Sequence, residues 1–179
     1  MKSELYQRID PSNASTNRRN ANLDFILKNP HCLGDLIALG VNLNYKNHFK
    51  AIWIIEMIAE SKPELLQPYI AILCDTLSKH KNHSAIRGMS RTLLFISKTD
   101  KISLTQNQEE KIIETCLDWL IRDERVAPKV YAMYTLCLFF DKYDWVKAAL
   151  KDIINKDYPH QSAAYKACAR EVLKRINKP

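Results

Sequence analysis

The chain has 179 residues, enough for one domain with a hydrophobic core, and its 46% apolar content excludes a largely disordered protein. Only three glycines occur, too few and too far apart for the glycine-rich phosphate loops of P-loop and Rossmann proteins. The net charge of +7 is concentrated in residues 125–179, which carry 11 basic and 5 acidic side chains. An acidic partner is therefore expected to bind this C-terminal third first.

Apolar residues recur with helical spacing along almost the whole chain, and no strand pattern of period two is present. The sequence therefore predicts an all-α protein. In chain order, the expected helices cover residues 2–9, 15–29, 31–41, 47–61, 64–79, 83–98, 108–123, 126–142, 144–156 and 160–177.

Two helix starts carry the residues of a capping box, in which the side chains of the first and fourth residues bond each other's backbone N–H groups. One is Ser61 with Glu64, where Pro63 also suits a first helical turn. The other is Thr105 with Gln108. The helix at 47–61 is apolar on nearly all sides, so we expect neighbours to cover most of it.

Cysteine use and hydropathy indicate the compartment. The number of cysteines is odd and none forms a Cys-x-x-Cys pair: Cys32, Cys74, Cys116, Cys137 and Cys168. Residues 1–5 lack the apolar segment of a secretory signal. The longest apolar runs have about ten residues, below the roughly 20 that span a membrane. We expect a reduced, cytoplasmic protein with no membrane span.

The predicted helices form pairs that repeat. Four segments align without gaps, each with an aliphatic residue at its fourth position and a long or aromatic side chain at its second: 52–57, 90–95, 133–138 and 169–174. Their offsets are 38, 43 and 36 residues. A period near 40 with two helices per period is typical of a helical solenoid, and a closed multi-helix bundle is the alternative.

On these repeats, residues 15–177 resemble HEAT-like repeats of the armadillo superfamily. The resemblance implies a right-handed α-solenoid (an α–α superhelix) of about four antiparallel helix pairs with a C-terminal capping helix. It also implies a single domain over residues 1–179, with residues 1–13 as a candidate peripheral segment. Such repeats serve many functions, so the fold does not identify a partner.

Basic residues recur near the starts of successive helices, where they oppose the helix dipole. With nearby aromatic residues they predict a cation-rich binding surface made of Lys50, Trp53, Arg87, Arg91, Lys129, Tyr134, Lys166 and Arg170. The last helix continues the pattern with Lys166, Arg170, Lys174 and Lys178, four residues apart. The simpler alternative is that these are ordinary solvated side chains.

We therefore expect a non-enzymatic interaction or scaffold module that binds a protein partner through this surface, with no cofactor. His80 and His83, near Cys74 and Asp75, are too few convergent ligands for zinc, so no metal is expected. Sequence-independent nucleic-acid binding is the alternative. Within it, Trp119 and Asp123 are similar to the aromatic–aspartate pair of HEAT-like DNA alkylation glycosylases, although core packing also explains Trp119.

Overall fold

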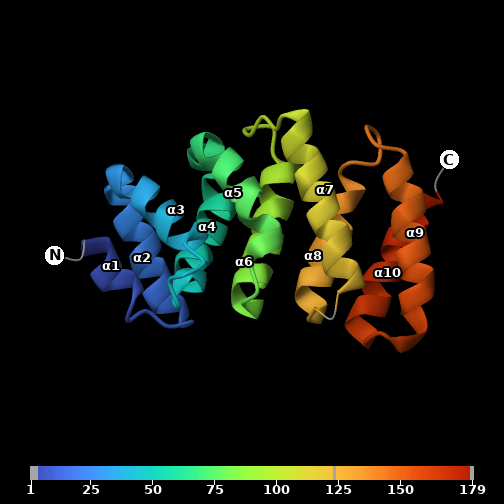
Figure 1. Ribbon diagram of the computed structural model, residues 1–179, viewed down its shortest axis with the longest axis horizontal. Helices are drawn as coiled ribbons and strands as arrows, with labels where there is room; N and C mark the ends of the chain where they lie inside the picture. The colour runs from blue at the N-terminus through green and yellow to red at the C-terminus, as the bar shows by residue number, and fades with distance from the viewer. Residues whose placement is uncertain (1–3, 123, 178–179) are drawn as a thin grey trace. The chain divides into compact units, whose positions relative to one another are not determined.

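A computed structural model describes residues 4–122 and 124–177. In these ranges there are ten α-helices, four short 3₁₀-helices and no strand, which confirms the all-α class (Figure 1). The chain divides into two compact units, Met1–Ser103 and Leu104–Pro179, called unit 1 and unit 2 below. The expectation of one domain over 1–179 stays a prediction.

The helices follow the expected order. Unit 1 contains α1 (Glu4–Ile9), α2 (Thr16–Lys28), η1 (Pro30–Cys32), α3 (Leu33–Val41), α4 (His48–Ser61), η2 (Pro63–Tyr69), α5 (Ile70–Thr76), η3 (Leu77–Lys79) and α6 (His83–Lys98). Unit 2 contains α7 (Gln106–Ile121), α8 (Val126–Cys137), α9 (Trp145–Asp157), η4 (Tyr158–His160) and α10 (Ala163–Ile176).

One predicted capping box forms and the other does not. Thr105 and Gln108 bond each other's backbone N–H groups at the start of α7. The Ser61–Glu64 box is wrong, because the Ser61 hydroxyl instead donates to the Met57 carbonyl at 2.7 Å. Pro63 and Pro68 both lie in the segment that follows, and each lacks an N–H donor. This segment forms the 3₁₀-helix η2, so the continuous helix expected over 64–79 is broken and α5 begins only at Ile70.

In unit 1, α4 is covered as its composition predicted: it packs against α2, α3 and α6, and eight of its fourteen residues are buried. Gly88 of α6 allows the closest approach, because a Cβ there would lie 2.7 Å from Ile52 Cγ2. Gly88 faces Ile52 and Arg91 faces Glu56, so α4 and α6 run parallel (Figure 1). The segment expected to be peripheral contributes the buried Leu5 and Ile9 to this unit.

In unit 2, α8 packs against α7, α9 and α10 (Figure 1). Its core contains the fully buried rings of Trp119 and Tyr165. Contacts between α8 and α10 join Val130 to Cys168 and Tyr134 to Glu171, so these helices also run parallel.

Many contacts between elements join residues that lie about one predicted repeat apart in the sequence. Five side-chain hydrogen bonds between elements join residues 34 to 37 apart: Tyr45–Asp10, Arg91–Glu56, Lys101–Glu64, Tyr143–Glu109 and Tyr134–Glu171. Others have separations of 31 (Arg91–Glu60), 33 (Lys142–Glu109) and 26 (Lys151–Asn177). Helices also pack on the next helix but one: α3 on α5, α4 on α6, α7 on α9, and α8 on α10. Each unit therefore brings residues one predicted repeat apart into contact.

Candidate binding surfaces on α6 and α10

The two arginines predicted on α6 are paired with carboxylates of α4. Arg91 donates to Glu56 at 2.6 Å and to Glu60 at 2.8 Å, and Arg87 lies 4.0 Å from Glu56. The Glu56 side chain is only 1% exposed, and such a charge is tolerated only with a close partner. Two cations thus meet two carboxylates, and this surface of unit 1 carries little net charge.

The two predicted residues of α4 also have intramolecular partners. Lys50 Nζ donates to the carbonyl oxygen of Asp10 at 2.5 Å. Trp53 is half-buried and packs edge-on against Phe49, with ring centroids 5.2 Å apart. Lys50 therefore fastens the segment after α1 to the start of α4.

Lys129 of α8 is a buried lysine. Only 5% of the Lys129 surface is exposed. Its ammonium donates to the Leu120 carbonyl at 2.8 Å and lies 3.8 Å from the Asp157 carboxylate. The Leu120 carbonyl belongs to the last turn of α7, where carbonyls lack helical donors. Lys129 therefore caps α7 and does not belong to an exposed cationic surface.

The cations of α10 differ from those of α6 in their partners. Lys166 Nζ donates to the carbonyl of Pro159 at 3.2 Å and lies 5.6 Å from the centre of the Tyr158 ring. Arg170 donates to the Tyr158 hydroxyl at 3.0 Å. Both partners are neutral oxygens, and Lys174, one turn further, is exposed. The row Lys166, Arg170 and Lys174, called the α10 cation row, keeps its positive charge.

Tyr134 lies at the α8–α10 contact. Its hydroxyl donates to Glu171 at 2.8 Å, and Arg175 bonds the same carboxylate. The bond to Glu171 raises the pKa of Tyr134, and the bonds from Tyr134 and Arg175 lower the pKa of Glu171. The charges of Glu171 and Arg175 cancel each other. Tyr134 therefore joins α8 to α10 beside the α10 cation row without changing its charge.

Sequence reasoning missed Tyr158. It lies in η4, directly before α10, and contacts both Lys166 and Arg170. A tyrosine and a proline shortly before a basic helix were the available signal.

Of the predicted Trp119–Asp123 pair, the structure describes only Trp119. Trp119 has no exposed surface, so its ring lies in the core of unit 2 and is not available to stack on a base. Asp123 lies outside the described residues.

The described residues contain no group of three or more histidine, cysteine, aspartate or glutamate side chains placed to hold a metal ion. His80 is buried and stacks on His48 with ring centroids 5.5 Å apart, whereas His83 is exposed. As for the membrane, none of the helices in residues 4–122 and 124–177 combines the length and apolar character needed to cross it.

A depression of about 490 Å³ lies in unit 1 where α4 and α6 end, lined among others by Glu60, Phe95 and Lys101. Glu60 accepts from Arg91, and Lys101 lies 3.5 Å from Glu64. Two of its charged groups, Glu60 and Lys101, are thus already paired. The α10 cation row is the better candidate for binding a charged ligand.

Comparison with protein-family models, with curated proteins and with solved structures found no match to this chain.

Proposed function

We propose that this protein is a non-enzymatic interaction module that binds an acidic segment of a protein partner through the α10 cation row. The observation that carries the proposal is the partnering of Lys166 and Arg170 with neutral oxygens alone. Cations without a carboxylate partner remain available to an incoming anionic group, and they steer its approach.

The proposal includes the architecture. We assign both units to a HEAT-like, right-handed α-solenoid, in which stacked helix pairs offer an extended surface for a partner. The support is that five side-chain hydrogen bonds, found in both units, join residues 34 to 37 apart. The packing of α3 on α5 and α4 on α6 in unit 1, and of α7 on α9 and α8 on α10 in unit 2, supports it as well.

A protein segment fits α10 better than a nucleic acid does. The three cations recur every fourth residue and so span about 12 Å along the helix, the reach of a few carboxylates. The exposed Ala163 and Ala167 on the same helix leave room for side chains of a partner. Tyr158, the aromatic residue beside the row, is engaged by Lys166 and Arg170 and is not free to stack on a base.

The test is a fluorescence-anisotropy titration with a labelled glutamate-rich peptide. Replacing both Lys166 and Arg170 by Gln is expected to weaken binding about tenfold or more, because two charge contacts are lost. The matched control is Lys151→Gln on α9, an exposed lysine of the same unit, which should leave the affinity unchanged.

Equal affinity of the double variant and the unchanged chain would remove the proposal. Tighter binding of duplex DNA than of the peptide would favour the nucleic-acid alternative. In that case the logarithm of the binding constant should fall with the logarithm of the salt concentration, with a slope of about −0.9 for each phosphate contact. Cytoplasmic location is part of the proposal too and rests on the free cysteines, among them the fully buried Cys116.

A further inference from the structure

Unit 1 has an apolar pocket of about 230 Å³ where the last turn of α2 meets the 3₁₀-helices η1 and η2. Its walls are five apolar residues, of which Leu27, Pro30 and Leu65 remain partly or fully exposed: Ile26, Leu27, Pro30, Leu33 and Leu65. A closed cavity of about 150 Å³ with walls of this kind holds benzene. The pocket of unit 1 therefore has room for one aromatic side chain.

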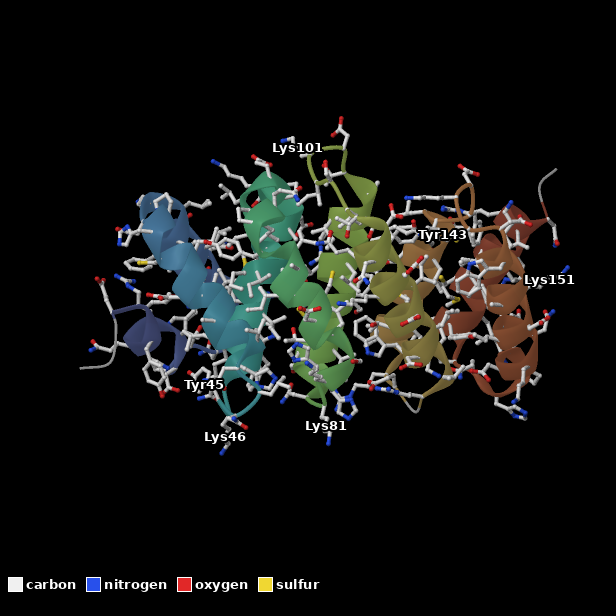
Figure 2. All side chains as sticks on the ribbon, turned by 45° about the horizontal axis from the view of Figure 1, so that its top comes forward. Tyr45, Lys46, Lys81, Lys101, Tyr143 and Lys151 are labelled. Carbon is white, nitrogen blue, oxygen red and sulfur yellow. The ribbon has the colours of Figure 1, made fainter. Side chains whose placement is uncertain are left out.

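The charged groups at this pocket are mainly basic. Lys62 and Glu64 line it, and the ammonium of Lys101 lies 3.5 Å from the Glu64 carboxylate. Figure 2 shows Lys101 at the end of unit 1 away from Tyr45 and Lys46. Two cations thus stand against one carboxylate, so one positive charge remains at the rim. This charge favours an aromatic side chain that has acidic neighbours.

Unit 2 carries an exposed aromatic side chain. Trp145, the first residue of α9, is 52% exposed. Among the large apolar side chains that are exposed in residues 4–122 and 124–177, it is the only aromatic one. The turn before it is fixed, because the Tyr143 hydroxyl donates to Glu109 at 2.6 Å and the Tyr143 ring packs edge-on against Phe139. Tryptophan on a rigid support is among the side chains that most often anchor a protein interface.

The neighbours of this tryptophan are mainly acidic. Asp144 precedes Trp145 and has a 93% exposed side chain, and Asp141 is exposed as well. Lys147 lies 3.3 Å from Asp144 and offsets one of these charges. Lys142 is already paired with a carboxylate of α7. One negative charge therefore remains beside the indole, opposite in sign to the charge at the pocket rim.

We infer that this protein associates with itself: Trp145 of one copy inserts into the apolar pocket of unit 1 of a second copy, with Asp144 next to Lys62. The two surfaces differ, so the contact is heterologous, and copies join head to tail instead of closing as a two-fold dimer. A contact anchored by one side chain is small, and the association is weak. The inference does not depend on the function proposed for α10.

The first test is methyl NMR of the full chain at concentrations up to about 1 mM, where dissociation constants near that value are measurable. At about 0.15 M salt the Debye length is about 8 Å, so the repulsion between two chains of net charge +7 is screened and pairs in contact are retained. An indole in the pocket should shift the methyl signals of Leu27, Leu33 and Leu65 through its ring current. The inference is overturned if these signals do not change with concentration.

Single variants identify the two surfaces. Trp145→Ala should remove the shifts, whereas Ile121→Ala, which truncates a 65% exposed side chain of the same unit, should preserve them. In unit 1, Leu65→Glu places a charge in the pocket and should abolish association, whereas Leu43→Glu, at an exposed leucine that does not line the pocket, should not. Shifts that persist in Trp145→Ala would show that another group enters the pocket and would overturn the inference.

Mixing the two defective chains gives the most specific result. Isotope-labelled Trp145→Ala keeps the pocket, and unlabelled Leu65→Glu keeps the indole. The shifts should therefore reappear in the labelled chain on mixing. Sedimentation should then show pairs only, because neither chain can extend the assembly. If the mixture shows no shift, the inference is wrong.

A charge exchange tests the orientation of the contact without altering the apolar walls. Lys62→Glu changes an exposed residue, so folding should persist, and association should weaken by about threefold to tenfold. Asp144→Lys in the other chain should restore it. Failure of the exchange would overturn the pairing of Asp144 with Lys62. A failed peptide titration on α10 has no bearing on any of these results.

Discussion

Unit 1 and unit 2 use the same sequence pattern in opposite ways. On α6, Arg87 and Arg91 stand four residues apart and face the buried Glu56 and the nearby Glu60 of α4. On α10, Lys166 and Arg170 also stand four residues apart, but they bond only neutral oxygens. The first pair joins two helices, and the second pair leaves positive charge at the surface.

The difference lies in the partner helix. Whether a basic pair is neutralised depends on a carboxylate 31 to 35 residues earlier, as Glu56 is for Arg91 and Glu60 is for the same arginine. A row of cations within one helix is therefore weak evidence for a charged surface until the neighbouring helix is known.

The largest expected effect comes from removing the buried carboxylate of unit 1. Glu56→Ala leaves Arg91 without its closest partner and opens space beside Gly88. Breaking a buried pair from one side typically lowers the free energy of unfolding by about 3 to 5 kcal/mol. Urea unfolding monitored by circular dichroism measures the loss.

The matched control in unit 2 is Glu171→Ala, which removes an exposed carboxylate bonded by Tyr134 and Arg175. Solvent screens this pair, so a much smaller loss is expected. If the two variants lose the same stability, the Glu56 pairs are not the structural contact described above.

The second largest effect is a loss of stability in acid, which is expected for unit 1 and not for unit 2. His80 is buried in unit 1 with a pKa near 4, against 6.5 when the chain unfolds, while His160 of unit 2 is exposed. Between these two values the unfolded chain binds a proton that the folded chain does not. Stability is therefore constant above about pH 6.5 and falls by up to roughly 3 kcal/mol as the pH approaches 4.

Urea unfolding over this pH range measures the decrease, and hydrogen exchange shows whether α4 and α6 open before α8 and α10. The variant His80→Gln should lose most of the pH dependence, and His160→Gln should keep it. An unchanged slope in His80→Gln would show that this ring does not cause the acid sensitivity.

Most of the fold was accessible from the sequence because helical periodicity and caps are local. Helix α6 begins at His83 and ends at Lys98, as predicted, with Asn82 accepting from two N–H groups of its first turn. The Thr105–Gln108 box also formed. The failure at Ser61 has a local cause too, since Pro63 and Pro68 favour 3₁₀ turns over a continuous helix.

The sequence did not predict which side chains and carbonyls contact the site residues. Nothing near Lys129 in the sequence indicates that the Leu120 carbonyl and Asp157 enclose it, because Asp157 follows 28 residues later. The stacking of His80 on His48 likewise joins residues of different helix pairs. Periodicity assigns such residues to a helix and a face but does not give the side chain opposite.

The smallest expected effect concerns two lysines of unit 2 that the sequence placed in one surface. Lys129→Met should remove the donor to the Leu120 carbonyl and the neighbour of Asp157. Leaving one helix-terminal carbonyl unpaired in a buried place costs about 1 to 2 kcal/mol. Lys166→Met, at a half-buried surface position, should change stability by no more than about 0.5 kcal/mol.

Binding of the glutamate-rich peptide should show the reverse order. Lys129→Met should bind the peptide as the unchanged chain does, because the Lys129 side chain is 6% exposed and its ammonium is already bonded. Lys166→Met should weaken binding, because its ammonium has only the Pro159 carbonyl as a hydrogen-bond acceptor. If Lys129→Met weakened peptide binding more than Lys166→Met did, the buried lysine would belong to the binding surface, and the separation of structural and binding cations in unit 2 would be wrong.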